Sequence, residues 1–310
     1  MILMVLLAVS SFASGNGEKE LEEINISYVR DPFNLPLIIM KEKQMAEEEF
    51  GKKGIKVNYY EINSGAKQSE AIAAGSLDIA SVINTASVIL ANAAGNPVEI
   101  FSGFSRPEQM FTIITASDSV KTPADLRGKT VAGPRGTVLD ELLEAVLAKE
   151  GMSRKDINFV NMSIPNATSA MLAGKVDCAL AAAAGVIAAE KNGARILVTC
   201  EGYVKPLLVA AAGKKFAAEH PAMLETYLSA YEKAVKWIAE NEEEAIRIGA
   251  EVQDISLEDA KRLYSWSHFI SKLTAADLEA LDYDIDFMLK SEMIDNRIDK
   301  MSFVNPSALE

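Results

Sequence analysis

Histidine, cysteine and positive charge are scarce in this sequence. Its 310 residues include 2 His and 2 Cys, and 31 Lys+Arg stand against 44 Asp+Glu, for a formal net charge of −13. Two cysteines are too few for a disulfide scaffold, and two histidines leave little material for metal or acid–base chemistry. The surplus of negative charge repels a phosphate backbone, so a nucleic-acid partner is not expected. Neither a metal nor a cofactor is predicted.

The sequence also lacks the short motifs of common enzymes. It contains no HExxH, CxxC, G-x-S-x-G, Walker-type loop or Asp-rich calcium loop. Gly133–Thr137 (GPRGT) falls between an expected strand and an expected helix, where backbone N–H groups can meet an anion. It has neither the Lys-Ser/Thr of a phosphate-binding loop nor the third glycine of a dinucleotide loop. Because both histidines, His220 and His268, fall in the C-terminal third, no acid–base pair stands out and an enzyme is not expected.

One short apolar run opens the chain. Residues 2–9 read ILMVLLAV and are followed by small and polar residues. This is the length of a signal-peptide core, whereas a membrane span needs about 20 residues. Ser11 and Ala13 supply the small residues for cleavage after Ala13, although no Lys or Arg precedes the run. A buried N-terminal strand is the alternative, but we predict that 1–13 is a signal peptide and that the protein is exported to the periplasm or cell surface.

Strands and helices alternate twice along the chain. Expected strands at 24–30, 55–62, 78–83 and 98–104 are separated by helices that begin at Asn34, Ser64 and Asn84. The pattern recurs with a short helix at 122–125, strands at 130–133 and 157–162, a helix at 137–151 and a helix capped by Asn166. Such alternation predicts parallel sheets covered by helices on both faces.

An internal repeat accompanies this alternation. Ala74–Asp78 (AGSLD) corresponds to Ala173–Asp177 (AGKVD), and each follows an Ala-rich helix and precedes a small apolar strand. Two copies of one α/β unit predict two similar lobes, with chance similarity between Ala-rich helices as the alternative. After a last strand at 206–212, helices are expected at 223–239, 257–269 and 275–290, in a tail that packs back on the first lobe.

Five segments carry a family resemblance. They are YVRDPFNLPLIIMKEKQMAEEEF at 28–50, SGAKQSEAIAAGSLDIASV at 64–82, KTPADLRGKTVAGPRGT at 121–137, LAGKVDCAL at 172–180 and KKFAAEHP at 214–221. In this order they resemble the substrate-binding proteins of nitrate/sulfonate/taurine-type ABC importers, a family that includes binders of thiamine precursors. The resemblance covers nearly all of residues 24–290.

The resemblance implies an α/β, two-lobed periplasmic-binding-protein-like fold of type II, with a mostly parallel sheet in each lobe and a helical C-terminal tail. Lobe one would comprise 24–113 and 208–310, and lobe two 114–207. The two crossings between lobes would lie near Phe111–Thr115 and Tyr203–Ala210, with ligand bound in the cleft between the lobes.

The resemblance also implies where a ligand binds. The family's cleft loops map onto 30–34, 63–66, 83–86, 135–137 and 165–168, and each opens a helix whose free N–H groups suit an anionic or carbonyl-bearing group. The predicted ligand-binding residues are Arg30, Asp31, Phe33, Asn34, Ser64, Gly65, Asn84, Thr85, Arg135, Gly136, Thr137, Asn166 and Trp266.

Several of these residues have an alternative interpretation in which they do not bind ligand. Asp31 is placed to neutralise Arg30, Arg135 is as well suited to a surface ion pair, and core packing is the favoured interpretation of Trp266. The three asparagines are equally suited to capping their own helices and nothing more. Cys178 and Cys200 are open to pairing in an oxidising compartment, but free buried thiols are favoured.

The expected function is that of a monomeric extracytoplasmic receptor. It would bind a small anionic or aromatic ligand, such as a sulfonate, nitrate or an aromatic carboxylate, and deliver it to the membrane permease of an ABC importer. An enzyme on the same scaffold, acting on a pyrimidine or thiamine-precursor-like compound, is the alternative, but the Cys-rich motif of the pyrimidine-synthesising relatives is absent. A ligand-sensing regulator would need a DNA-binding helix-turn-helix where this chain has a signal-like segment.

Overall fold

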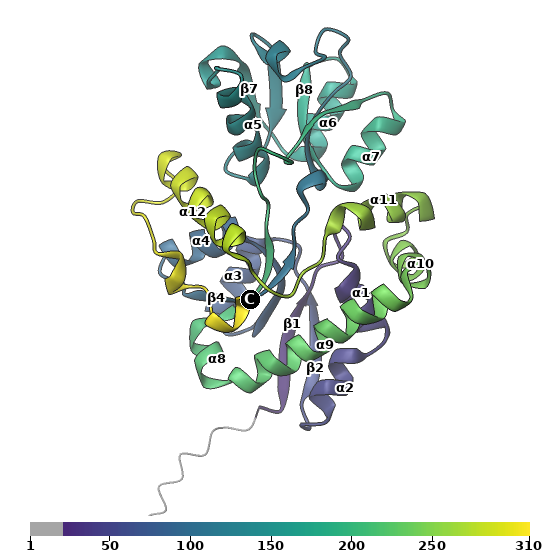
Figure 1. The fold of residues 1–310 in the computed structure, drawn as a ribbon, viewed down its shortest axis with the longest axis vertical. Helices are drawn as coiled ribbons and strands as arrows, with labels where there is room; N and C mark the ends of the chain where they lie inside the picture. The colour runs from purple at the N-terminus through teal and green to yellow at the C-terminus, as the bar shows by residue number, and fades with distance from the viewer. Residues whose placement is uncertain (1–20) are drawn as a thin grey trace, which may run out of the picture.

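The structure is a computed structural model that describes residues 21–310. It forms two lobes, one above the other in Figure 1, each with a five-stranded sheet flanked by helices. This confirms the predicted two-lobed α/β fold with a helical C-terminal region. The predicted signal peptide at 1–13 lies outside the described residues. Among residues 21–310, no helix combines the length and the apolar character that crossing a membrane requires.

The sheet of lobe one has the strand order β2-β1-β3-β10-β4. Its strands are β1 (Glu23–Tyr28), β2 (Lys56–Glu61), β3 (Ile79–Asn84), β4 (Val98–Ser105) and β10 (Leu208–Gly213). β1 runs parallel to β2 and β3, whereas β10 runs antiparallel to β3 and β4. The sheet is therefore mostly parallel, and its one antiparallel strand is the segment that returns from lobe two.

The sheet of lobe two repeats this arrangement with the order β7-β6-β8-β5-β9. Its strands are β5 (Phe111–Thr115), β6 (Thr130–Gly133), β7 (Asn158–Asn161), β8 (Cys178–Ala182) and β9 (Arg195–Thr199). β6 is parallel to β7 and β8, and β5 is antiparallel to β8 and β9. Each lobe thus receives its antiparallel strand from the chain that has just crossed over.

The crossings lie at 106–110 and 200–207, between β4 and β5 and between β9 and β10. The prediction of a crossing at Phe111–Thr115 is wrong by a few residues, because all of β5 pairs with β8 inside the sheet of lobe two. Likewise, Leu208 to Gly213 belong to the sheet of lobe one, so only the first part of the predicted second crossing connects the lobes.

Two aspartates give the internal repeat a structural counterpart. Asp78 Oδ2 accepts a hydrogen bond from the backbone N–H of Asn25 at 2.7 Å, and Asp177 Oδ2 accepts one from the N–H of Thr130 at 2.8 Å. Each aspartate holds the start of the neighbouring parallel strand, β1 in lobe one and β6 in lobe two. The repeated sequence therefore encodes the same contact in both lobes.

Helices cover the sheets of both lobes. Lobe one carries α1 (Leu35–Glu42), α2 (Met45–Gly51), α3 (Gly65–Ala73) and α4 (Thr85–Ala93), and lobe two carries α5 (Val138–Lys149), α6 (Ile164–Leu172) and α7 (Ala184–Lys191). Short 3-10 turns lie at Glu108–Met110, Pro123–Leu126, Arg154–Asp156, Lys300–Ser302 and Pro306–Ala308. The helix predicted to begin at Asn34 is followed directly by a second one, α2, because Gln44 adopts a left-handed backbone with φ of 55° between them.

The C-terminal tail returns to lobe one. It consists of α8 (Lys214–Glu219), α9 (Pro221–Glu240), α10 (Glu242–Gln253), α11 (Leu257–Ser267) and α12 (Ala275–Lys290), of which α8 and α10 were not predicted. α9 runs across α1 and α2, and α12 packs on α4 (Figure 1). The buried Tyr231 hydroxyl of α9 donates to the carbonyl oxygens of Phe104 and Ile270, at 3.0 and 2.8 Å, so polar contacts fix the helix on the sheet.

Lobe two has its own apolar core between its sheet and α5. Cys178 and Cys200 both lie in it, free and fully buried. Burial raises the pKa of the Cys178 thiol to about 12 and raises that of Cys200 as well, so both thiols stay protonated. The structure thus favours free buried cysteines over the disulfide.

Candidate ligand-binding site

A cavity of about 470 Å³ lies between the two lobes. Lobe one contributes the ends of β1 and β3 and the starts of α3 and α4, and lobe two contributes the end of β6 and the starts of α5 and α6. The second crossing and α12 complete the wall. Carboxyl ends of parallel strands are where α/β proteins usually bind ligands, and this volume suits a small molecule.

Six of the predicted residues meet at this cavity. Asp31, Gly65, Asn84 and Thr85 line it from lobe one, and Gly136 and Thr137 line it from lobe two. Residues far apart in sequence are therefore brought to one place by the fold, and both lobes take part.

The start of α4 presents an unpartnered amide to the cavity. Asn84 Oδ1 accepts a hydrogen bond from the N–H of Ser87 at 2.8 Å, and the N–H of Thr85 is bonded to the carbonyl of Leu207 at 3.3 Å. Within the described part of the chain, the N–H of Ala86 is left without a partner. Because Ala86 lines the cavity, this amide is available to a ligand.

The start of α5 offers the same chemistry from lobe two. Thr137 Oγ1 accepts from the N–H of Asp140 at 3.4 Å, and the N–H of Gly136 donates to Asp140 Oδ2 at 2.9 Å. The N–H groups of Val138 and Leu139, both lining residues, have no acceptor among residues 21–310. Helix N-termini from both lobes therefore direct partial positive charge at the cavity.

Two glycines permit this close approach. A Cβ on Gly65 would lie 2.3 Å from Ser87 Oγ, so the starts of α3 and α4 pack together only because position 65 lacks a side chain. Gly136 has a φ of 67°, in the left-handed region that favours glycine, and a Cβ there would lie 2.8 Å from Met293 Cε.

Among the described residues, no lysine or arginine lines the cavity. Three residues with carboxyl groups do line it: Asp31, Glu141 and Asp284. Arg30 is turned away, with its guanidinium donating to Glu61 Oε1 at 2.8 Å and to the carbonyl of Val252 at 3.3 Å. Arg135 is exposed and outside the lining. The structure therefore corrects the prediction that these two arginines bind ligand in the cleft. The carboxylate that pairs with Arg30 is Glu61 and not Asp31.

Glu141 and Asp284 form a carboxyl pair across the cleft. Glu141 belongs to α5 of lobe two and is 4% exposed, and Asp284 belongs to α12 of the tail on lobe one and is 8% exposed. Asp284 Oδ2 accepts a hydrogen bond from Thr85 Oγ1 at 2.7 Å. Burial first, and then the neighbouring Asp284 carboxylate, raise the pKa of Glu141, while burial also raises the pKa of Asp284. The pair therefore retains a proton at neutral pH.

Phe33, Asn34 and Trp266 do not line the cavity. Phe33 is 1% exposed in the core, where its ring faces Gly249 of α10. Asn34 is buried at the start of α1 without capping it, because its Nδ2 donates to the carbonyls of Val29 and Asp31 at 2.9 and 2.7 Å. Trp266 is buried in the core with the Arg262 guanidinium over its ring. Their sequence-based assignment to the cleft is corrected by these positions.

Ser64 and Asn166 also lie outside the lining. Ser64 caps α3, with its Oγ accepting from the N–H of Lys67 at 3.5 Å. Asn166 is exposed in the first turn of α6, and the N-cap of that helix is Ser163, so the prediction that Asn166 is the cap is wrong. Pro165 at the second helical position moves the helix start earlier than the asparagine suggested.

Sequence reasoning missed Gln68, Glu141 and Asp284. Gln68 is buried beside the cavity, accepts from Ser27 Oγ at 2.9 Å and donates to the carbonyl of Val82 at 2.9 Å. Glu141 lies four positions after the predicted cap Thr137, so helical periodicity places it on the same side of the helix and was the available signal. Asp284 carries no local signal.

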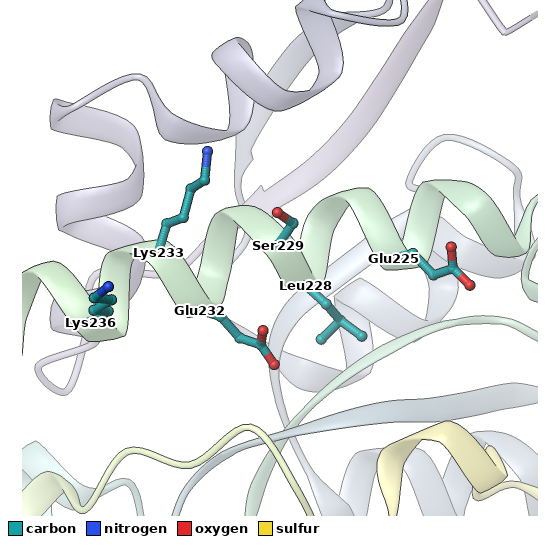
Figure 2. A pocket seen from close by; sticks show the side chains of 6 residues that line it. All are labelled: Glu225, Leu228, Ser229, Glu232, Lys233 and Lys236. Carbon is teal, nitrogen blue, oxygen red and sulfur yellow. The ribbon is translucent and has the colours of Figure 1, made fainter.

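A second hollow lies on the outer surface of α9, and Figure 2 shows its six lining side chains along that single helix. They are Glu225, Leu228, Ser229, Glu232, Lys233 and Lys236. One helix face lines this hollow, and among residues 21–310 no helix start contributes to its lining, so it offers no converging groups. The cavity between the lobes is the better candidate site.

Residues 46–245 match a family model described as NMT1/THI5 like. The match spans more than half of the chain. The chain belongs to the NMT1/THI5-like family. This confirms the resemblance to substrate-binding proteins that the sequence motifs indicated.

Similar proteins agree with this assignment. The NMT1/THI5-like chain is 29% identical over 317 residues to a Bacillus subtilis (strain 168) protein named for aliphatic sulfonate binding, across 98% of this chain and 94% of the relative. The crystal structure of the periplasmic aliphatic sulphonate binding protein SsuA from Escherichia coli superimposes with a TM-score of 0.84 at 21% identity, covering 93% of this chain and 94% of that chain.

A third similar protein is the alkanesulfonate-binding protein SsuA from Xanthomonas axonopodis pv. citri bound to MOPS. Its TM-score is 0.78 at 22% identity, with 92% of this chain and 99% of that chain covered. At these identities the two solved structures show the fold. All three relatives are named as binding proteins, in agreement with the expectation that the chain is not an enzyme.

Proposed function

We propose that this protein is an extracytoplasmic receptor that binds a small sulfonate in the cavity between its lobes and presents it to the permease of an ABC importer. The names of its relatives support a sulfonate over nitrate or an aromatic carboxylate. The observation that carries the proposal is the convergence of unpartnered helix-start amides from both lobes on one cavity.

This arrangement suits a sulfonate because its charge is spread over three oxygen atoms. Ala86 of α4 and Val138 and Leu139 of α5 supply amide donors from opposite sides. Amides bind an anion without a lysine or arginine, since each helix start carries partial positive charge. Anion binding is therefore compatible with a net charge of −13.

Both lobes contact the ligand, so binding favours the arrangement in which the lobes are together. The permease then distinguishes the loaded receptor from the empty one by the relative position of the lobes. This mechanism requires the protein outside the cytoplasm, as the predicted signal peptide implies, and works with a monomer.

Calorimetry with matched ligands tests the proposal. Ethanesulfonate, 2-hydroxyethanesulfonate and 2-aminoethanesulfonate are compared with propanoate, benzoate and nitrate. We expect at least one sulfonate to bind more tightly than every other ligand. At about 100 times its Kd, it should stabilise the protein by about 2.7 kcal/mol. Tighter binding of propanoate, benzoate or nitrate than of all three sulfonates would refute the proposal.

Two variants test the location. Asn84→Leu and Thr137→Leu place a bulky side chain at the cavity from lobe one and lobe two, and each should lower sulfonate affinity at least tenfold. Each also removes a helix cap, for about 1 kcal/mol of stability. Asn192→Leu is the control, because Asn192 is exposed at the end of α7 and outside the cavity lining. Unchanged affinity in both cleft variants would place the site elsewhere.

A further inference from the structure

The carboxyl pair in the cleft joins elements that belong to different lobes. Glu141 lies on α5 of lobe two, Asp284 lies on α12, which packs on α4 of lobe one, and both side chains are buried. The two carboxyl groups are hydrogen-bonded to each other. Because an ionised carboxylate only accepts hydrogen bonds, this contact exists only while a proton lies between the two groups. The lobes are therefore connected at this point through one proton.

The hydrogen bonds of the pair place that proton on Glu141. Thr85 Oγ1 donates to Asp284 Oδ2 at 2.7 Å, a contact that suits an ionised acceptor. Burial first, then the charge of Asp284 and the hydrogen bond with it, raise the pKa of Glu141. Burial also raises the pKa of Asp284, but the hydrogen bonds with Thr85 and Glu141 act in the opposite direction. Protonated Glu141 is therefore the donor and ionised Asp284 the acceptor.

The surrounding side chains do not replace this proton. The titratable and charged groups on the elements around the pair are Asp140 and Glu144 of α5, Arg154 beside them, Glu279 and Tyr283 of α12, Cys200 and Lys205 of the second crossing, and Asp31 after β1. Of the two cations among them, Arg154 is held by Asp140 and Glu144, and Lys205 is exposed. The charges that act on Glu141 are those of Asp284 and Asp140, both negative.

Separation of the lobes at this point would release the proton. Once α5 and α12 move apart, water reaches both carboxyls, which then ionise near pH 4, and the proton passes to the solvent. The closed form thus holds one proton more than the open form. The ratio of closed to open molecules should therefore fall about tenfold for each pH unit over which only the closed form keeps the proton.

We propose that Glu141 and Asp284 form a proton-dependent latch between the lobes, which holds the cleft closed while the pair shares a proton and opens it as the pH rises above neutrality. Ligand capture, which brings the lobes together in the proposed function, then takes up a proton from the solvent. Only this second consequence rests on the proposed function, since the latch consists of groups of the protein alone.

Two spin labels, one on each lobe, measure closure without a ligand. Lys56→Cys on β2 and Asn158→Cys on β7 provide exposed attachment points, and the native Cys178 and Cys200 are buried. As the pH rises from 6 to 9, pulsed electron paramagnetic resonance should show a second distance between the labels. The population at this distance, relative to the closed one, should rise by up to about tenfold per pH unit. A distance distribution that stays the same from pH 6 to pH 9 would overturn the latch.

Three variants of the labelled protein separate the latch from other effects of pH. In Glu141→Gln the side-chain amide donates to Asp284 at every pH in this range, so only the closed distance should remain. Glu141→Ala has no donor, so the second distance should be present already at pH 6. Glu279→Gln removes an exposed carboxylate from α12 and should respond to pH as the parent does. An unchanged pH response in Glu141→Gln, or a closed Glu141→Ala, would overturn the proposal once circular dichroism shows that the variant is folded.

Calorimetry tests whether ligand capture takes up the proton. 2-Hydroxyethanesulfonate is titrated into the protein at the pH where the second distance predominates, in triethanolamine and in Tris, two buffers that are not anions and differ in ionisation enthalpy. The wild-type protein should take up close to one proton per bound ligand, and Glu141→Gln should take up none. Binding without proton uptake would overturn the coupling. If this sulfonate and the others do not bind, the proposed function fails, and the spin-label distances still decide the latch.

Discussion

Replacing Glu141 by glutamine should make the unliganded protein more stable at neutral pH. The variant keeps the shape of the side chain and removes its titration. In the folded protein, burial and the Asp284 carboxylate raise the pKa of Glu141. The unfolded chain exposes Glu141 to water, where it ionises with an ordinary pKa near 4.3. The folded state therefore binds a proton that the unfolded state has released.

The sign and size of the effect follow from this proton. A group whose pKa is raised by folding contributes stability below its unfolded pKa, and that contribution is lost as the pH rises through the folded pKa. Where the folded group keeps its proton and the unfolded group has lost it, each pH unit lowers stability by about 1.4 kcal/mol. Between pH 5 and pH 7 the wild-type protein should lose ~3 kcal/mol that Glu141→Gln does not lose.

Thermal unfolding without ligand at pH 5, 6, 7 and 8 measures the difference. At about 2 °C per kcal/mol for a chain of this size, the variant should melt ~6 °C higher than the wild-type protein at pH 7 and much closer to it at pH 5. Glu279→Gln removes an exposed carboxylate from α12 and controls for the general effect of net charge. Parallel pH profiles for wild type and Glu141→Gln would show that the carboxyl pair holds no extra proton.

Three further variants or reactions test other parts of the structure. Asp277→Asn removes the carboxylate that Arg106 Nε contacts at 2.8 Å and that caps α12. Urea unfolding should therefore show that the free energy of unfolding falls by about 3 kcal/mol. A fall below about 1 kcal/mol would contradict the contact. Gly136→Ala should lower the melting temperature, because φ is 67° and the new Cβ meets Met293; an unchanged value would refute this strain. Cys178 and Cys200 should react with a thiol reagent at pH 8 only after denaturation, and rapid native labelling would show that they are accessible.

The sequence predicts the lobes because their repeat encodes a contact that recurs. Asp78 and Asp177 each bond the backbone of the neighbouring strand, so the matching segments had to fold alike. The helix starts were equally predictable from the sequence. Asn84 and Thr137 are small polar residues between a strand and a helix, and both cap their helices at the cavity.

Side-chain direction was less predictable than helix position. Phe33 and Asn34 precede a helix at the carboxyl end of β1, as a cleft residue should, yet both are buried inside lobe one. Asn34 uses its amide on the carbonyls of Val29 and Asp31, a choice that depends on the loop backbone. Local sequence identifies the loop but does not determine which of its side chains turn inward.

Asp284 shows where sequence reasoning ends. It is 199 positions from Thr85, its hydrogen-bond partner, and it reaches the cavity only because α12 packs on α4. No periodicity or motif specifies that docking. The acidic character of the cleft therefore depends on tertiary packing of the tail, whereas its amide donors depend on local helix starts.

The charges that face each other between the lobes differ between the α7–α11 contact and the cleft. Where α7 of lobe two meets α11 of the tail, Lys191 pairs with Asp259 and Arg262 pairs with Glu190. These pairs are partly exposed, so each contributes at most about 1 kcal/mol and together they do not lock the lobes. At the cleft the facing groups are instead two acids, Glu141 and Asp284. The contacts between the lobes are therefore complementary in charge where α7 meets α11 and acidic on both sides at the cleft.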